Sequence, residues 1–215
     1  MLELVRRFLP AGTRRVLEVG PSPLGPLLSA TVGLAVDTLG LEPDAEGPGG
    51  RHYHLDLNDA ASAATPAGMP AYGLVVFAEV IEHLHTSPLH VLRFVRTLLV
   101  ERGVLLLQTP NAASLPKRLK LLAGRNPYER IRIDAGNPGH FREYTLAELL
   151  EDAGETGFEV LEVGRHFYFD ARFAHHGADG VRPQPVLGSI KNAVYRALPP
   201  FLREGLTLVL RAGRA

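Results

Sequence analysis

Strand-like and helix-like segments alternate along this chain from residue 15 to residue 163. The clearest strand is the apolar run Leu74–Ala78, which is typical of a central parallel strand buried on both faces. Four other runs have strand length and are expected to join the same sheet: 15–19, 33–37, 51–56 and 104–108. This alternation predicts an open α/β sheet with helices on both faces. At 215 residues, the chain is expected to form one domain over 1–215.

The helix boundaries are indicated by residues that favour helix ends. Thr145 and Glu148 have the spacing of a capping box, which predicts a helix start at this point. Ser87 precedes a proline and an amphipathic run, for which Gly103 is the expected end. Ser22 is the expected N-cap of a short helix that follows the first strand.

The last part of the chain has a different pattern. Strands are expected at 158–163 and near the C-terminus at 206–210. Because no segment between them has the pattern of a crossover helix, the last strand is expected to be antiparallel to its neighbours.

Two insertions, 112–142 and 165–204, are longer than ordinary connections. Between residues 115 and 142 there are seven Lys or Arg and two Glu or Asp, a local charge of +5. This segment is either a solvated basic face or a substrate lid, and its place after the fifth strand favours the lid. The apolar stretch at 186–203 is a candidate site cover, dimer contact or interfacial helix, but packing on the protein's own core is favoured.

Charge and cysteine content exclude several classes of function. Basic and acidic residues number 23 each, so no net field attracts nucleic acid. The absence of Cys excludes thiolate catalysis and cysteine-bound zinc, and no histidine spacing indicates a metal site. No apolar run reaches the roughly 18 residues of a membrane span. The charged N-terminus argues against a signal peptide, so a cytoplasmic protein of undetermined oligomeric state is expected.

Ligands of open parallel sheets bind at the carboxyl ends of the strands. Gly20 follows the first strand, where the missing Cβ lets a ligand approach the backbone. Asp37 ends the second predicted strand, where a carboxylate can accept both hydroxyls of a ribose. Ser22 stands between two prolines that lack an N–H, so a pyrophosphate would be poorly held. S-adenosylmethionine has an adenosine and no phosphate, and its ammonium group would favour Glu18.

Six sequence elements occur in an order and spacing that are specific when taken together. They are Val16–Gly20, Asp37, Asp56 with Leu57, Tyr72–Leu84, Gly103–Asn111 and Gly139–Thr145. With these elements, the chain resembles the class I S-adenosylmethionine-dependent methyltransferases from about residue 10 to 164 and again near 205–212. The resemblance implies a Rossmann-like sheet of seven strands with helices on both faces and an antiparallel last strand.

The resemblance also implies a function and a set of site residues. The expected reaction is metal-independent methyl transfer from S-adenosylmethionine to oxygen or nitrogen of a small or medium-sized acceptor, and an anionic acceptor is one alternative. The expected cofactor residues are Glu18, Gly20, Ser22, Gly25, Asp37, Asp56, Leu57 and Glu79. The catalytic candidates are His83, His140 and Glu79, with His83 either a general base or a structural residue. The substrate candidates are Tyr128, Arg130, Arg142 and Tyr144.

Two other functions stay open at this point. The segment Gly20–Gly25 is one residue longer and stiffer than the usual first motif, which leaves room for a non-catalytic cofactor-binding or scaffold protein. A nicotinamide-dependent oxidoreductase is less favoured, because it needs the phosphate cradle that this segment lacks.

Overall fold

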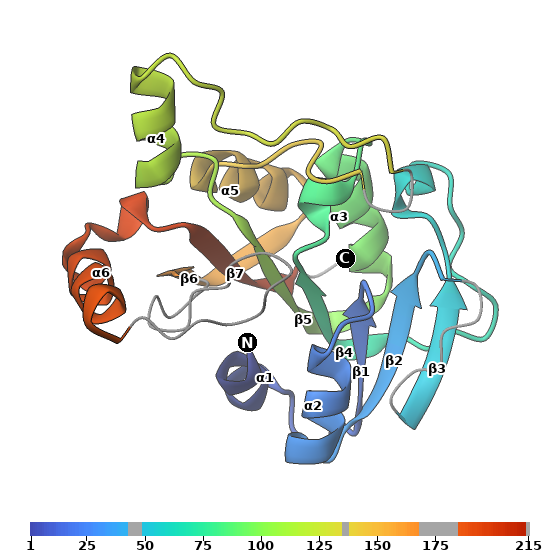
Figure 1. Ribbon diagram of the computed structural model, residues 1–215. Helices are drawn as coiled ribbons and strands as arrows, with labels where there is room; N and C mark the ends of the chain where they lie inside the picture. Colours follow the sequence, from blue (N-terminus) through green and yellow to red (C-terminus); the bar gives the residue numbers. More distant parts are fainter. Residues whose placement is uncertain (43–48, 135–137, 168–184, 214–215) are drawn as a thin grey trace.

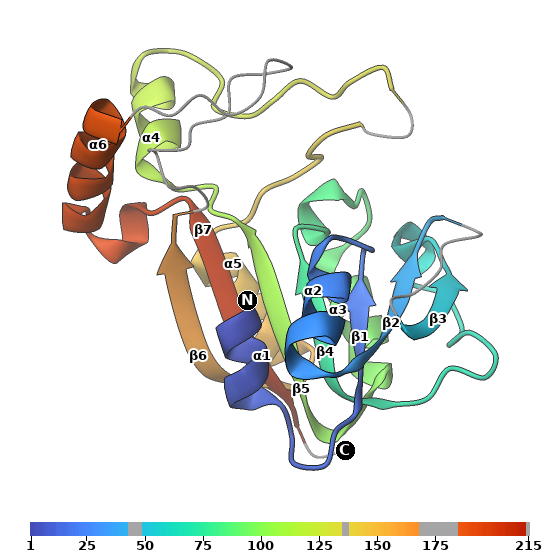
Figure 2. The same ribbon diagram turned by 60° about the horizontal axis from the view of Figure 1, so that its bottom comes forward.

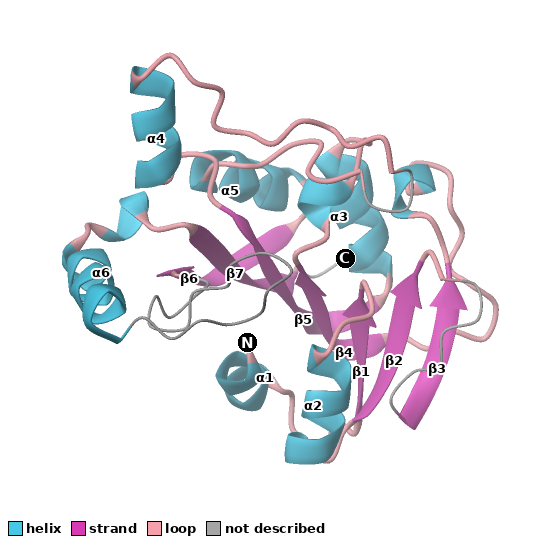
Figure 3. Cartoon of the chain, viewed as in Figure 1, coloured by secondary structure: helices cyan, strands magenta, loops and turns pink. Residues whose placement is uncertain are grey.

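A computed structural model describes residues 1–42, 49–134, 138–167 and 185–213, and in these the apolar runs pair into one seven-stranded sheet (Figure 3). The strand order is β3-β2-β1-β4-β5-β7-β6. The strands are β1 Arg15–Val19, β2 Ala35–Gly40, β3 Gly49–His54, β4 Tyr72–Ala78, β5 Leu99–Pro110, β6 Phe158–His166 and β7 Gly205–Ala212. The first five pair in parallel, whereas β7 is antiparallel to both β5 and β6. The predicted fold class and the antiparallel last strand are confirmed.

Helices cover both faces of the sheet (Figures 1 and 2). On one face, α3 Pro88–Thr97 and α5 Leu146–Glu155 bury apolar side chains in the larger core cluster. On the other face, α1 Leu2–Phe8 and α2 Leu24–Val32 contribute Val5 and Leu28 to a second cluster. Short 3₁₀ turns follow β3 and β4, η1 Leu57–Asp59 and η2 Ile81–His83, and a third, η5 Pro200–Leu202, precedes β7. The capping box at Thr145 and Glu148 is present as predicted.

Three predicted element ends are corrected. The helix expected to end at Gly103 ends at Thr97, and Gly103 lies inside β5, where an added Cβ would stand 3.0 Å from the Tyr72 carbonyl oxygen. The N-cap of α2 is Pro23 rather than Ser22. Strand β2 begins and ends later than predicted, so Asp37 pairs with Leu17 in mid-strand.

The two insertions carry helices that expose apolar side chains. Helix α4, Leu115–Leu122, buries none of its residues, and Leu122 is 84% exposed. Helix α6, Pro185–Ala197, exposes Val186, Ile190 and Val194, which corrects the expectation that this segment packs on the protein's own core. Both helices lie beyond the β5–β7 side of the sheet (Figures 1 and 2). Residues 168–184 of the second insertion lie outside the described part. Within that part, no helix is long and apolar enough to cross a bilayer.

Candidate functional site

The turn after β1 brings Gly20 against the segment that follows β4. Gly20 has φ 77°, and its N–H donates to the Leu39 carbonyl at 2.8 Å. An added Cβ would stand 2.4 Å from Cγ2 of Val80, so only glycine fits here. The carboxyl ends of β1 and β4 are thereby held close together at one edge of the sheet.

Glu18 is buried at this edge, 3% exposed, and has one unsatisfied oxygen. The Ser22 hydroxyl donates to Oε1 at 2.6 Å, while Oε2 has no hydrogen-bond partner in the described residues. Burial raises the pKa of the Glu18 carboxyl above its usual value, and hydrogen bonds from Ser22 and the Gly25 backbone oppose that rise. Ser22 and Gly25 therefore act on Glu18, and Oε2 is left as an acceptor for a cation or donor.

The structure corrects the assignment of Asp37 to a ribose. Its side chain is fully buried in mid-strand, and both oxygens are occupied. Oδ2 accepts from the Tyr72 hydroxyl at 2.7 Å, and Oδ1 accepts from the Arg51 N–H at 2.7 Å and from Arg15 at 2.5 Å. Gly50 makes room for this carboxylate, because an added Cβ would stand 2.5 Å from Oδ1. Asp37 is thus a structural acid that no ligand at the carboxyl edge can reach.

Glu42 is an acid near the end of β2 that was not among the predicted cofactor residues. It lies two residues beyond the end of β2 and is exposed. Its Oε2 is 3.0 Å from the position of a Cβ added at Gly40, and Pro21 lies on the same side. No local pattern in the sequence singles out Glu42, because the end of β2 at Gly40 depends on its pairing with β1.

Asp56 lies at the carboxyl end of β3 as expected. Its Oδ1 caps η1 by accepting from the Asn58 backbone N–H at 2.8 Å and from the Asn58 side chain at 2.9 Å. Leu57 is 5% exposed, and its side chain packs in the larger core cluster. The cofactor role of Leu57 stays a prediction, and it would fall to the backbone because the side chain is in the core.

The turn after β4 gathers two acids. Glu79 has a left-handed backbone, φ 58°, which is costly for a residue other than glycine. Two hydrogen bonds hold it in place. Its backbone N–H donates to the Gln108 carbonyl at 2.9 Å, and the Gln108 side-chain amide donates to its Oε1 at 3.1 Å. Glu82 is fully buried, and Thr109 donates to its Oε2 at 2.9 Å. Burial, and then the neighbouring charge of Glu79, raise the pKa of Glu82 to about 8.

The segment before α5 folds back onto this turn. The backbone N–H of Phe141 donates to the Glu82 carbonyl at 2.8 Å. This contact places His140 against His83, with ring centroids 4.7 Å apart in an edge-to-face arrangement. Two catalytic candidates 57 positions apart in the sequence are thus brought together.

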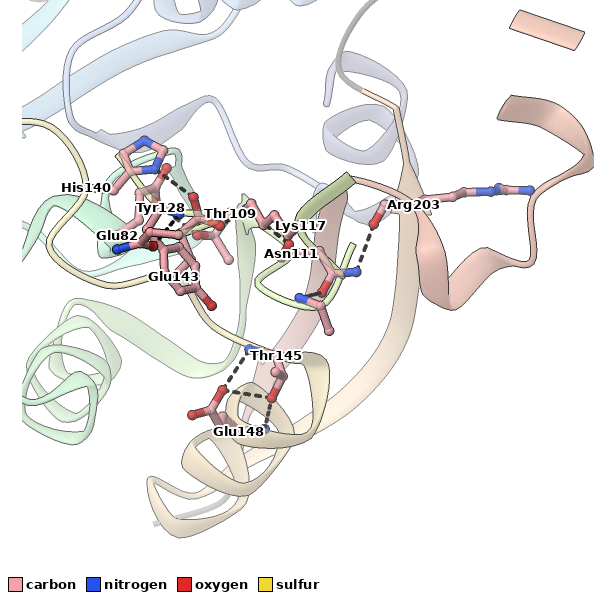
Figure 4. A network of polar contacts seen from close by, with 12 residues as sticks. Glu82, Thr109, Asn111, Lys117, Tyr128, His140, Glu143, Thr145, Glu148 and Arg203 are labelled. Atoms are coloured by element: carbon pink, nitrogen blue, oxygen red, sulfur yellow. Dashed lines mark hydrogen bonds and ion pairs between the residues drawn. The ribbon is translucent and has the colours of Figure 1, made fainter. Parts of the chain in front are cut away.

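His140 belongs to a polar network between β5, α4 and the segment before α5 (Figure 4). Its Nδ1 lies 3.1 Å from Glu143 Oε1, and Glu143 also forms an ion pair with Lys117. Lys117 in turn donates to the Asn111 carbonyl at 3.1 Å. Burial lowers the pKa of Lys117 to about 8, and burial followed by the proximity of His83 lowers that of His140.

A cleft of about 510 Å³ opens beside His140. Its lining residues are Ala112, Tyr128, Glu129, Ile131, His140, Phe141, Arg142, Glu143, Thr145 and Glu148. The volume suits a small organic molecule.

The four substrate candidates differ in where they lie. Tyr128 lines the cleft and is 43% exposed. Arg142 also lines it, but it pairs with Glu148 at 2.6 Å and lies over the Tyr144 ring. Arg130 is exposed and is not among the lining residues. Tyr144 is 2% exposed within the larger core cluster, so its assignment to substrate binding is corrected.

Comparison with known proteins identifies the family. A family model described as a methyltransferase domain matches residues 1–163. The chain belongs to the class I S-adenosylmethionine-dependent methyltransferases. Membership of this family makes the protein an enzyme that uses S-adenosylmethionine as its cofactor. No curated protein matches its sequence.

Solved structures share the fold of this methyltransferase at low sequence identity. An S-adenosylmethionine-dependent methyltransferase from Archaeoglobus fulgidus is 15% identical, with a TM-score of 0.56 over 98% of this chain and 92% of that one. The N-methyltransferase NodS from Bradyrhizobium japonicum, in complex with S-adenosylhomocysteine, is 13% identical, with a TM-score of 0.54 over 99% and 85%. The [4+2]-cyclase SpnF is 16% identical, with a TM-score of 0.60 over 100% and 80%.

The carboxyl edge of the methyltransferase has a group that fits its cofactor. Oε2 of Glu18 is buried and unsatisfied in the described residues, which is costly for a carboxylate. The ammonium group of S-adenosylmethionine is a hydrogen-bond donor with the opposite, positive charge. This unpaired carboxylate oxygen therefore suits the amino-acid end of the cofactor.

Replacing Glu18 by Gln is expected to stabilise the free protein and to weaken cofactor binding. The amide nitrogen can take the place of Oε2, and the buried charge is removed. The pKa of Glu18 is raised in the folded protein, so ionisation of this carboxyl destabilises the fold above that pKa. At low pH the carboxyl is protonated in both the folded and the unfolded protein, and this effect disappears. At neutral pH we therefore expect Glu18→Gln to unfold at a higher Tm than the wild-type protein.

Thermal unfolding at pH 7.5 and at pH 4, below the ordinary carboxyl value of 4.5, measures this effect. The gain should vanish at the lower pH. A variant that is less stable than wild type at pH 7.5 would show that the Glu18 charge is satisfied within the protein.

Proposed function

We propose that this methyltransferase transfers the methyl group to an oxygen or nitrogen of a small, neutral acceptor bound in the cleft beside His140. The observation that carries the proposal is the position of that cleft. It opens at the carboxyl side of the sheet, where His140 contacts the turn that follows β4. S-adenosylmethionine supplies a methyl group activated on a sulfonium.

The carboxyl edge offers a contact for each polar part of the cofactor. We assign Glu18 to the ammonium group, Glu42 to the ribose hydroxyls and the Asp56 turn to the adenine edge. Glu18 lies in β1, and Glu42 follows the neighbouring parallel strand β2. Gly20 comes directly after β1. The assignment of Glu42 replaces that of Asp37.

The lining of the cleft favours a neutral acceptor over an anionic one. Arg142 is its one arginine, and Glu148 already pairs with it. Glu129 and Glu143 line the same wall and form ion pairs with Arg132 and Lys117. The basic residues of 112–142 therefore do not make the cleft itself positive.

The walls of the cleft can orient the acceptor and keep water from it. Tyr128 and Phe141 offer aromatic surface, and Tyr128 stands on the segment predicted to be a lid. His140 lines the cleft and His83 packs against its ring, so these two side chains are assigned to contact the acceptor atom that loses a proton. Orientation of the acceptor toward the methyl group is expected to supply most of the rate.

Methyl transfer from radiolabelled S-adenosylmethionine to a panel of phenols, alcohols, amines and carboxylates tests the proposal. We expect label on a neutral hydroxyl or amine acceptor. For that acceptor, Tyr128→Ala should raise KM roughly fivefold to tenfold with cofactor affinity unchanged, the scale of a lost aromatic contact.

The matched control is Leu122→Ala, at an exposed α4 position that is not among the lining residues of the cleft. It should leave KM unchanged. Label found only on carboxylates or on a ring carbon of the phenols, or a Tyr128→Ala variant with weakened cofactor binding, would contradict the proposal.

A further inference from the structure

Three potential metal ligands converge at the turn after β4. Glu82 and His83 come from η2, and His140 comes from the segment before α5. One ligand atom from each residue lies within 4.8 Å of the other two. The hydrogen bond from Phe141 to the Glu82 carbonyl holds the two segments together at this point.

Both imidazole rings are oriented by their Nδ1 atoms. His83 Nδ1 lies 3.0 Å from the Gly139 carbonyl, which can only accept, so Nδ1 carries the proton. His140 Nδ1 lies 3.1 Å from the Glu143 carboxylate, which also only accepts, so this Nδ1 carries a proton as well. Each ring therefore keeps Nε2 as a free lone pair. Histidines that bind metals are commonly oriented in this manner, by donating the other N–H to a carbonyl or carboxylate.

Glu82 supplies an independent observation. Its side chain is fully buried, and Oε1 has no hydrogen-bond partner in the described residues, while Oε2 accepts from Thr109. When Glu82 is ionised, this buried oxygen is strongly unfavourable unless a cation or donor faces it. The histidines beside it present lone pairs once their Nδ1 atoms are protonated, so they do not satisfy it.

We propose that Glu82, His83 and His140 bind a divalent transition-metal ion beside the acceptor cleft, which His140 lines. Two imidazoles and one carboxylate favour ions such as Zn²⁺, Co²⁺, Mn²⁺ or Fe²⁺ over Mg²⁺, which prefers oxygen ligands. Three protein ligands leave coordination positions open for an exogenous ligand. Ligands about 2.1 Å from an ion lie roughly 3.4 Å apart in a tetrahedral site, so the cluster contracts by small side-chain rotations.

The metal site extends the proposed function and changes one expectation. No metal was expected from the sequence, because His140 lies far along the chain from Glu82 and His83 and no spacing reveals their proximity. The role of the ion rests on the proposed function: it would hold an oxygen or nitrogen of the acceptor in the cleft. Binding of the ion itself does not depend on that function.

Calorimetric titration of chelator-treated protein with Co²⁺, together with its visible absorption spectrum, tests the site. Wild-type protein should bind one equivalent, and Mg²⁺ should bind at least tenfold more weakly. His83→Ala and His140→Ala should each weaken Co²⁺ binding at least tenfold and alter the Co²⁺ spectrum. The control His90→Ala, an exposed histidine on α3, should change affinity less than twofold.

Titration of each variant with S-adenosylhomocysteine distinguishes loss of the metal site from loss of the fold, and all variants should retain this binding. Absence of a Co²⁺ complex in wild type, or equal affinity in the His83→Ala and His140→Ala variants, would overturn the metal site. Absence of S-adenosylhomocysteine binding by wild-type protein would instead overturn the proposed function and leave the metal result standing.

Discussion

Asp37→Ala is expected to lower the stability of the methyltransferase by about 3 kcal/mol, or roughly 6–12 °C in Tm. The Tyr72 hydroxyl is buried and donates to Asp37 at 2.7 Å, so removing the carboxylate leaves it without this acceptor. The Arg51 N–H also loses its acceptor. Arg15 contributes less, because its side chain is 45% exposed and water can replace the carboxylate.

A double substitution separates these effects. Adding Tyr72→Phe to Asp37→Ala removes the orphaned hydroxyl, and it should recover about 1 kcal/mol. Thermal unfolding of the four proteins in this cycle measures the coupling. A stable Asp37→Ala variant with tenfold weaker cofactor binding would return Asp37 to the ribose and refute the structural role.

Glu42→Gln is expected to weaken S-adenosylhomocysteine binding by roughly 10-fold to 100-fold without changing stability. A carboxylate can accept from both ribose hydroxyls, and hydrogen bonds to charged groups contribute about 1.5–3 kcal/mol. Glutamine has the same shape but offers one acceptor oxygen and no charge. Glu42 is exposed in the free protein, so its charge has little effect on folding.

The matched control is Glu101→Gln, an exposed carboxylate near the opposite, amino end of β5. Its affinity for S-adenosylhomocysteine should equal that of wild type. Equal losses in both variants would mean that net charge, and not a ribose contact, governs binding.

The sequence predicted the features that depend on neighbouring residues. The capping box of α5 lies within four residues, and the apolar run of β4 carries its own burial pattern. The end of β2 was misplaced because an aspartate usually terminates a buried strand. In the fold, Asp37 is accommodated by Tyr72, 35 positions away, which no local pattern reveals.

The same limit applies to the candidate site. Glu18 and Gly20 could be placed because a strand and its turn fix them. The packing of His140 on His83 depends on a backbone hydrogen bond between segments far apart in the sequence. Tyr144 was assigned to substrate because an aromatic residue near a predicted site can serve either binding or the core, and here it fills the core.

The central claim is that the carboxyl edge of β1 to β4 holds S-adenosylmethionine and not a dinucleotide. Calorimetric titration of the wild-type protein with S-adenosylhomocysteine and, separately, with NAD⁺ tests it most directly. We expect micromolar affinity for S-adenosylhomocysteine and NAD⁺ binding at least about 100-fold weaker, a difference near 2.7 kcal/mol. Tighter binding of NAD⁺ than of S-adenosylhomocysteine would contradict the account.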